Sequence, residues 1–344
     1  MDFLQFESTF RYKAKVSGYS EENIIFCLKY AKPLVEKNFP VIFNTSNLAA
    51  LVGYKTQYLK RAALYTNFFY RSFTIKKANG KLRALKEPLP SLKEIQVWIL
   101  QNILYNPNVP ISKYAKAYIK KRNLLDNVKY HRSKEKVLTL DISNFFGSIE
   151  RKSIENIFRK IGYSSNISNL LSKLCCCDNS LPQGAPTSPI LSNIYLFDFD
   201  NFISKYCVTK NIRYTRYADD LAFSGNFDEE ILIEIVDEKL KTLNLFLNKE
   251  KIKVMKSNQK QIITGILVND VLQIPKSDRQ LIRQEVYYIK KFGLLDHLKR
   301  TKNERSNYIP HLLGKINFAL SINPKDKEML RYKEYIQNMI VTNK

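Results

Sequence analysis

The chain has 344 residues, a length that fits one or two domains. Lysine and arginine total 56 and aspartate and glutamate total 32, which gives a formal net charge of +24 and excludes an ordinary neutral metabolic enzyme as the default. The content of 44% hydrophobic and 12% aromatic residues excludes a disordered polycation. A folded protein with this charge is expected to bind a polyanion, either nucleic acid or an anionic membrane surface.

Two features argue against membranes and disulfides. No run approaches the roughly 18 apolar residues of a spanning helix, and the first residues do not resemble a secretory signal. The five cysteines, Cys27, Cys175, Cys176, Cys177 and Cys207, are odd in number and contain no Cys-x-x-Cys pair. They are expected to be buried and reduced, which indicates a cytoplasmic protein.

The first part of the chain predicts helices followed by a hairpin. Residues 1–60 read mainly as helices, and segment 44–53 has the pattern of a capped helix that stops at Gly53. Segment 71–77 alternates like a strand, segment 78–81 contains the Asn-Gly turn signal, and segment 82–85 would return as the partner strand.

A helix is predicted directly after this hairpin. Pro88 and Pro90 interrupt the strand pattern, and segment 91–94 (Ser-Leu-Lys-Glu) has the spacing of a capping box. The helix that this box would open places Ile95, Ile99 and Ile103 on one face.

The middle of the chain alternates strands and helices without a regular rhythm. Segment 136–142 is a β-rich run that contains Asp141, a helix is predicted near residues 150–162, and Ser188 is expected to cap another helix. Segments 212–217 and 221–224 read as strands around a tight turn.

The last third predicts a further hairpin and a helical end. Asp228 is expected to cap a helix, and segment 262–274 reads as a hairpin that turns at Asn269-Asp270. The chain from Ser277 onward is predicted to be helical and is rich in basic residues and tyrosine. The irregular mixture of elements favours an α+β fold.

Three carboxylates stand out as candidate metal ligands. Asp141 lies at the end of a predicted strand, and Asp219 and Asp220 lie in a predicted hairpin turn. Adjacent carboxylates repel one another unless a cation lies between them. Three carboxylates from two strands could hold two Mg²⁺ ions for phosphoryl transfer. The alternative for a bare Asp-Asp pair is an ordinary turn.

The sequence around these carboxylates resembles the reverse transcriptases. Segment 217–220 (Tyr-Ala-Asp-Asp) is similar to the Tyr-x-Asp-Asp box of that family. Other segments resemble its remaining motifs in the same order: the fingers hairpin at 73–83, the first palm motif at 141–146, the Pro-Gln-Gly motif at 181–189 and the next motif at 247–251.

Two further segments resemble the bacterial retron reverse transcriptases in particular. Segment 127–131 is similar to the Asn-Ala-x-x-His motif of retrons, with valine at the second position. Ile263, Thr264 and Gly265 are similar to the Val-Thr-Gly triplet of retrons, with isoleucine at the first position. The resemblance implies a right-hand polymerase: a helical N-terminal extension (1–45), fingers and palm (46–275), and a helical thumb (276–344).

The resemblance also implies roles for individual residues. Asp141, Asp219 and Asp220 would be catalytic and would bind two Mg²⁺ ions, with Mn²⁺ as an alternative, together with the backbone carbonyl of Ile142. The remaining roles concern the nucleotide and are implied in the same way. Lys77 and Arg83 would contact the triphosphate, and Phe146 would lie under the sugar and exclude a 2′-hydroxyl. Gln183 and Gly184 would form the floor of the nucleotide-binding site. Lys251 or Lys249 would donate a proton to the leaving pyrophosphate.

Two groups of residues concern the nucleic acid. His131 is read either as a core histidine that fixes a loop with Asn127 or as part of a surface that engages template RNA. One of Phe145 and Phe146 is expected to be core. The predicted thumb helix carries basic residues that would contact phosphates: Arg279, Arg283, Lys290 and Lys291.

The resemblance implies an RNA-directed DNA polymerase that copies part of a structured non-coding RNA into a branched, RNA-linked DNA. Its other implied partners are dNTPs and a separate effector protein, in an anti-phage defence system. Two alternatives stay open: another bacterial reverse transcriptase (group II intron-like, CRISPR-associated or another defence type), and a catalytically idle RNA-binding assembly protein.

Overall fold

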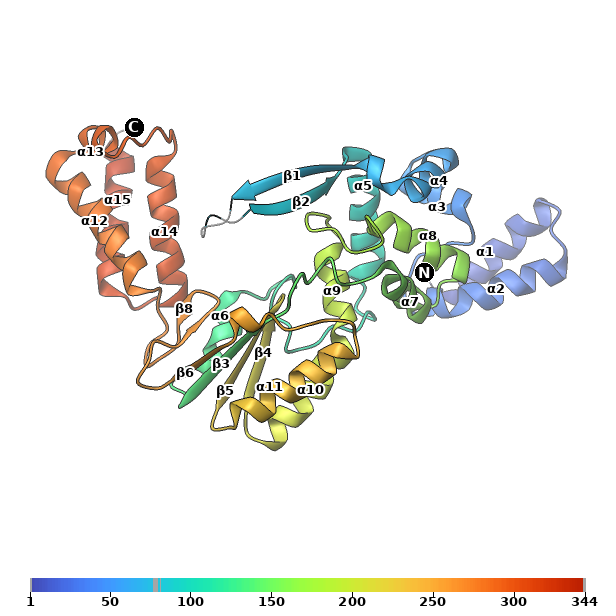
Figure 1. Ribbon diagram of the computed structural model, residues 1–344. Coiled ribbons are helices and arrows are strands. Elements are labelled where there is room, and N and C mark those ends of the chain that lie inside the picture. The colour runs from blue at the N-terminus through green and yellow to red at the C-terminus, as the bar shows by residue number, and fades with distance from the viewer. Residues whose placement is uncertain (1, 77–79, 81, 343–344) are drawn as a thin grey trace. The chain divides into compact units, whose positions relative to one another are not determined.

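The computed structural model describes residues 2–76, 80 and 82–342 (Figure 1). The chain forms two compact units, each made of several stretches of sequence. Unit 1 comprises residues 1–120, 142–205 and 233–248, and unit 2 comprises residues 121–141, 206–232 and 249–344. Both units mix helices and strands, which confirms the predicted α+β class.

Helices open unit 1, as predicted. They are α1 (Phe3–Val16), α2 (Glu21–Glu36), α3 (Thr45–Val52) and α4 (Thr56–Leu64). The predicted start and stop of α3 are both confirmed. The Asn44 side chain accepts a hydrogen bond from the Asn47 backbone N–H, and Gly53 takes the left-handed conformation (φ +76°) that ends the helix.

The predicted hairpin is formed by β1 (Tyr70–Lys76) and β2 (Leu82–Pro88), with Tyr70 opposite Pro88 and Lys76 opposite Leu82. Its predicted turn at 78–81 lies outside the described residues except for Gly80, which has φ +80°. The hairpin is followed by α5 (Pro90–Ile99), which continues through a π-helical turn (Leu100–Leu104). Ile95, Ile99 and Ile103 are fully buried, as predicted.

The capping box predicted at 91–94 is wrong. Helix α5 begins one residue earlier, at Pro90, and has no side-chain cap. Proline at the first turn already has the φ of a helix, so it sets the start. The Ser91 hydroxyl instead contacts the Tyr58 hydroxyl, and the Glu94 carboxylate accepts from the Tyr54 hydroxyl.

Further helices complete unit 1 or cross into unit 2. The first of them begins at Arg151, close to the predicted boundary, and buries Ile154, Ile157 and Phe158. The predicted cap at Ser188 is shifted by one residue: Thr187 is the N-cap, and Ser188 is the first helical residue. These helices are α7 (Arg151–Ile161), α8 (Ser165–Cys175), α9 (Ser188–Tyr195), α10 (Phe197–Thr209) and α11 (Glu229–Lys241).

The cysteines are free thiols, as predicted. Cys175, Cys176, Cys177 and Cys207 are buried, and Cys27 is half-buried. Burial raises the pKa of the Cys175 and Cys207 thiols to about 12, so both are neutral at physiological pH.

Unit 2 is built on an antiparallel sheet with strand order β4-β5-β3-β6. The central strand β3 pairs with β5 on one side and with β6 on the other. The predicted strands at 136–142, 212–217 and 221–224 are therefore confirmed. Their bounds are β3 (Lys136–Asp141), β4 (Arg213–Tyr217), β5 (Asp220–Gly225) and β6 (Lys253–Lys256).

The segment predicted as one hairpin that turns at Asn269-Asp270 forms two turns, and the second encloses Asn269-Asp270 as predicted. The first joins β7 (Ile262–Ile263) to β8 (Ile266–Leu267) and consists of Thr264 and Gly265. Both turn residues have positive φ (+45° and +82°), which glycine accepts without strain. A second, looser turn follows, because Leu267 also bridges to Gln273.

The predicted helical end of the chain is confirmed. The helices are α12 (Lys276–Phe292), α13 (Leu294–Thr301), α14 (Tyr308–Ile322) and α15 (Lys327–Thr342). They share one hydrophobic core with the sheet of unit 2, in which Val137 and Met255 of the sheet join Ile282, Leu312 and Ile336 of the helices. None of the helices in residues 2–342 as described is long and apolar enough to span a membrane.

Candidate active site

Two of the predicted catalytic carboxylates are cross-strand neighbours in unit 2. Asp141 ends β3, Asp220 begins β5, and the two residues are paired in the antiparallel register. The Cβ atoms of such a pair lie about 5 Å apart, so both side chains lie on the same face at one end of the paired strands. Val137, Leu138 and Leu140 of β3 are all buried, so both faces of this central strand are covered and a shift in register would disturb the packing on each.

The third carboxylate lies in the turn between β4 and β5. Tyr217 pairs with Asp220, so Ala218 and Asp219 form a tight two-residue turn in which Ala218 has φ +60°. The fully buried Arg216 donates from its guanidinium to the Ala218 carbonyl oxygen at 3.0 Å. Sequence reasoning missed this turn-holding role of Arg216, because an arginine in a strand is ordinarily exposed.

The carboxylates strongly influence one another. Burial, together with the charges of Asp219 and Asp141, raises the pKa of Asp220 to about 6. Lys251 donates to the Asp141 carboxylate at 2.8 Å, and this hydrogen bond raises the pKa of the lysine. Of the two lysines predicted as alternatives, Lys251 is therefore the one that contacts a candidate catalytic carboxylate, while Lys249 is exposed in the short helical turn beside it.

The donor chemistry of the three aspartates suits a divalent cation. Their mutual repulsion is a cost that a bound cation would remove, and carboxylate oxygens are suitable ligands for Mg²⁺. In the part of the chain that the structure describes, no group of three or more His, Cys, Asp or Glu side chains is already arranged around a metal position. A Mg²⁺ ion bound by these aspartates would complete its coordination with substrate phosphates, as Mg²⁺ ions in proteins commonly do.

A cleft of about 670 Å³ extends from these carboxylates to the turn between β7 and β8. Its lining includes Asp141, Asp220 and Lys251 together with Thr264 and Gly265. The side chain of Asn127, which also lines the cleft, donates to the Thr264 hydroxyl at 3.3 Å. Two segments predicted to mark the retron subfamily, 127–131 and 263–265, are therefore in direct contact.

His131 is a core histidine in this structure. It is fully buried at the end of a short helical turn (Lys129–His131), and its two ring nitrogens lie 2.8 Å from the Ser224 and Thr215 hydroxyls. The Thr215 hydroxyl in turn donates to the backbone oxygen of Asn127 at 3.2 Å. Of the two interpretations left open by the sequence, the structure favours the one in which His131 fixes a loop with Asn127.

Replacing His131 with alanine is expected to lower the free energy of unfolding by about 3 kcal/mol, because two buried hydroxyls lose their partner and a cavity remains. Urea denaturation of the purified protein measures this change. His311→Ala, at a half-buried site in α14, is the matched control and is expected to cost less than about 1 kcal/mol. Equal losses in both variants would contradict the structural role of His131.

The predicted nucleotide floor lies in unit 1, on the loop before α9. The Gln183 carbonyl oxygen accepts a hydrogen bond from the Lys86 backbone N–H of β2 at 2.9 Å. Gly184 has φ +129°, and a Cβ atom there would lie 2.8 Å from the Lys86 carbonyl oxygen. Only glycine therefore allows the loop to lie this close to the strand.

The residues predicted to contact the sugar and the triphosphate differ in their burial. Phe145 is buried and Phe146 is half-buried, which confirms that only one of the pair belongs to the core. The Phe146 ring lies between those of Phe145 and Tyr118, with centroid distances of 5.2 and 6.3 Å. Arg83 is exposed on β2, and Lys77 lies outside the described residues. Ile142 is buried directly after Asp141 in the chain.

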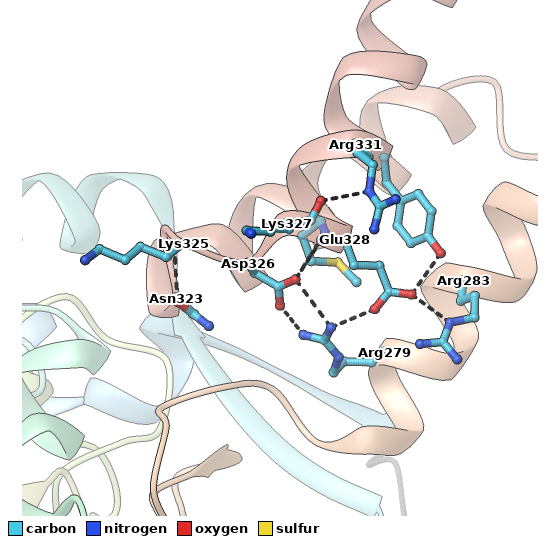
Figure 2. A network of polar contacts seen from close by, with 10 residues as sticks. Arg279, Arg283, Asn323, Lys325, Asp326, Lys327, Glu328 and Arg331 are labelled. Atoms are coloured by element: carbon cyan, nitrogen blue, oxygen red, sulfur yellow. Dashed lines mark hydrogen bonds and ion pairs between the residues drawn. The ribbon is translucent and has the colours of Figure 1, made fainter.

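The predicted thumb contacts are partly engaged within the protein (Figure 2). Arg279 of α12 forms ion pairs with Asp326 and with Glu328 of α15, and Arg283 also pairs with Glu328, at 2.7 Å. These arginines hold the pKa of Glu328 at about 2. Arg279 therefore stabilises the helical bundle in this structure, and its contact with nucleic acid stays a prediction.

The two lysines predicted beside them face aromatic rings. The Lys290 ammonium lies 4.5 Å from the Tyr335 ring centroid, and the Lys291 ammonium lies 5.3 Å from that of Phe292. Neither lysine has a carboxylate partner among the ion pairs of the described residues. Both remain candidates for phosphate contacts.

Replacing Arg279 with glutamine is expected to lower the free energy of unfolding by about 2 kcal/mol, because it leaves the mostly buried Asp326 without its cation. Arg283→Gln should cost less than about 1 kcal/mol, since the Arg283 side chain is 58% exposed. Thermal unfolding of both variants makes the comparison. A smaller loss of stability in Arg279→Gln than in Arg283→Gln would contradict the role of Arg279 in stabilising the helical bundle.

Comparison with known proteins agrees with this geometry. Residues 75–278, more than half of the chain, match the family described as reverse transcriptase (RNA-dependent DNA polymerase). The chain is 31% identical over 283 residues to the retron Ec83 reverse transcriptase of Escherichia coli, covering 77% of this chain and 86% of that protein. It is 27% identical over 296 residues to the retron Ec86 reverse transcriptase of the same species, covering 85% and 88%.

Solved structures add only a distant similarity. Apo telomerase from Candida tropicalis has a TM-score of 0.47 and 12% identity, covering 79% of this chain and 57% of that chain.

The matched segment contains the carboxylate pair, the Tyr217–Asp220 turn and the Gln183–Gly184 loop, so the fold and the candidate site define an RNA-directed DNA polymerase with the right-hand fold. The chain belongs to the reverse transcriptase family and, within it, to the bacterial retron type. Enzymes of this family generally use divalent metal ions and copy an RNA template.

Proposed function

We propose that this reverse transcriptase copies part of a structured non-coding RNA into a single-stranded DNA that stays joined to the RNA through a branch. The observation that carries the polymerase chemistry is the cross-strand pair of Asp141 and Asp220 beside Asp219. The retron context is supported by the similarity to the two retron reverse transcriptases and by the contact between Asn127 and Thr264.

Asp141, Asp219 and Asp220, with the carbonyl of Ile142, would hold two divalent cations. The cations, when bound, would lower the pKa of the attacking hydroxyl and stabilise the leaving pyrophosphate. The carboxylates would hold the cations at the end of the paired strands β3 and β5. Lys251 can donate a proton to the leaving group, since its hydrogen bond to Asp141 holds it at this end of the strands.

The residues of unit 1 would bind the incoming nucleotide. Arg83 and Lys77 would contact its triphosphate, since arginine binds phosphate as a fork and lysine as a point charge. Gln183 and Gly184 would form the floor under the base and sugar. Phe146 would exclude a 2′-hydroxyl.

The domain plan and the nucleic-acid contacts follow the same proposal. Residues 1–45 form an extension, 46–275 the fingers and palm, and 276–344 the thumb, whose Lys290, Lys291 and Arg283 contact duplex phosphates. The segments at Asn127–His131 and Ile263–Gly265 contribute to recognition of the RNA, with the buried His131 acting only through the position of its loop. A separate effector protein, held by the RNA–DNA complex in an anti-phage defence system, completes the proposed context.

Expression of the chain together with its native flanking DNA tests the proposal. The nucleic acid that co-purifies should contain a short DNA joined to RNA through a bond that a 2′,5′ debranching enzyme cuts. The Asp219→Asn/Asp220→Asn variant should lack it. A variant-sensitive but unbranched DNA would keep the polymerase and overturn the branched product. Bound RNA without DNA, combined with failure on a primed template, would favour the idle assembly protein.

A further inference from the structure

The hairpin formed by β1 and β2 has little support of its own. Nearly all side chains of β1 after Tyr70 are exposed, and β2 is exposed from Leu82 to Ala84. A two-stranded hairpin is marginally stable in isolation. Contacts near Tyr70 and Pro88, at the base of the hairpin, must therefore fix its orientation within unit 1. The exposed Arg83 depends on these contacts for its position.

The loop at residues 177–184 provides one such contact through its backbone. The Gln183 carbonyl oxygen accepts from the Lys86 N–H, and the backbone of Gly184 lies against the Lys86 carbonyl. Arg83 lies three residues from Lys86 along β2, about 10 Å at the rise of a strand. The loop that carries the proposed floor and the strand that carries a proposed triphosphate ligand are thus joined at Lys86.

The same loop holds the hairpin through side chains. The Lys86 ammonium forms an ion pair with the Asp178 carboxylate. The backbone N–H of Asp178 donates to the Asn67 side-chain oxygen at 3.3 Å, and Asn67 lies in the turn (Thr66–Phe69) directly before β1. Asp178 is held in the left-handed region (φ +49°), where its carboxylate points back to β2. Strand β2 and the turn that leads into β1 are therefore both tied to one residue of the loop, Asp178.

We propose that the ion pair between Lys86 and Asp178 is a positioning element that fixes the hairpin relative to the Gln183–Gly184 floor and thereby sets the affinity for the incoming nucleoside triphosphate. This inference rests on the proposed nucleotide-binding roles of Arg83, Gln183 and Gly184. The pair itself does not contact the reacting atoms. Its loss would change nucleotide binding and leave the chemical step nearly intact.

Single-nucleotide incorporation on a primed RNA template tests the pair. Asp178→Asn removes the charge at a φ that asparagine tolerates, and Lys86→Gln keeps the backbone N–H that bonds to Gln183. Each variant should raise the KM for dNTP by about two- to fivefold with kcat changed less than twofold. The double variant should match the single variants, because the pair is already broken in each.

Arg71→Gln is the matched control. Arg71 pairs with Glu87 across the same hairpin at 2.8 Å, in another solvent-accessible ion pair that does not involve the loop at 177–184. Its KM for dNTP should stay within twofold of the unmodified protein. An unchanged KM in Asp178→Asn, an equal rise in Arg71→Gln, or additive effects in the double variant would each overturn the proposal.

Hydrogen exchange provides a readout that needs no polymerase activity. Amide exchange in β1 and β2 should be faster in Asp178→Asn than in Arg71→Gln, because opening of the hairpin base becomes easier. Equal exchange in the two variants would overturn the positioning role even if the protein did not polymerise. Faster exchange with no incorporation by the unmodified protein would support the positioning of the hairpin and overturn the proposed function instead.

Discussion

Replacing Asp220 with asparagine is expected to lower nucleotide incorporation by at least about a thousandfold while making the metal-free protein more stable. The loss follows from removal of a proposed metal ligand. The gain follows from electrostatics, because burial and the neighbouring Asp219 and Asp141 raise the pKa of Asp220 to about 6. Incorporation is measured on a primed RNA template, and stability by urea denaturation in the presence of a chelator.

The pH dependence of this gain has a definite sign. The ordinary pKa of an aspartate is 3.8, so the unfolded chain releases this proton at a lower pH than the folded protein does. Ionisation therefore destabilises the folded state progressively between pH 4 and pH 6, by an amount on the order of 2 kcal/mol that persists at higher pH. Asp220→Asn should be more stable by this amount at pH 7.5 and equal to the unmodified protein near pH 4.

A surface carboxylate provides the control. Asp270 is exposed in the turn after β8, and Asp270→Asn makes the same change in charge within unit 2. It should leave incorporation unchanged and alter stability by less than about 0.5 kcal/mol. Mg²⁺ should raise the melting temperature of the unmodified protein and of Asp270→Asn, but not that of Asp220→Asn. Retained activity, or lower stability of Asp220→Asn at pH 7.5, would contradict the proposed metal site.

The position of Asp141 and Asp220 could be predicted from the sequence because the strand and turn that carry them have local sequence signals. A short β-rich run identified the strand that ends at Asp141, and turn chemistry identified the bend at Ala218–Asp220. The order of motifs then indicated that the two segments belong to one site. The pairing of Asp141 with Asp220 follows once both strands must bury their apolar side chains in one sheet.

The errors occurred where two local signals competed. Ser91 and Glu94 have the spacing of a capping box, but Pro90 starts α5 one residue earlier and the two side chains bond to tyrosines elsewhere. Asn269-Asp270 forms a turn as its sequence signal indicated, but the short strands β7 and β8 pair around the weaker signal Thr264-Gly265, so the segment contains two turns and not one. Local preference cannot indicate which of two turn signals the paired strands enclose.

Contacts between distant parts of the sequence had no local signal. The hydrogen bond from Asn127 to Thr264 spans 137 residues, and the ion pair between Lys86 and Asp178 spans 92. Such contacts depend on the assembled fold, so a single sequence does not indicate them. The burial of Arg216 likewise depends on the assembled fold, although its hydrogen bond to the Ala218 carbonyl oxygen is local.

Replacing Phe146 with valine is expected to lower the preference for dNTP over rNTP by about a hundredfold, because a smaller side chain leaves room for a 2′-hydroxyl. The half-buried Phe146 ring lies between the rings of Phe145 and Tyr118, which restrict its movement away from a bound sugar. Most of the change should be a rise in kcat/KM for rNTP, with kcat/KM for dNTP falling less than about tenfold. Single-turnover incorporation of each nucleotide measures both.

The neighbouring ring separates this effect from a general loss of packing. Phe145 is buried, so Phe145→Leu should lower the free energy of unfolding by about 1–2 kcal/mol and leave the ratio of dNTP to rNTP unchanged. Phe146→Tyr, which keeps the ring, should also preserve the ratio. A ratio that stays constant in Phe146→Val, or that falls equally in Phe145→Leu, would show that selection against the 2′-hydroxyl does not depend on Phe146.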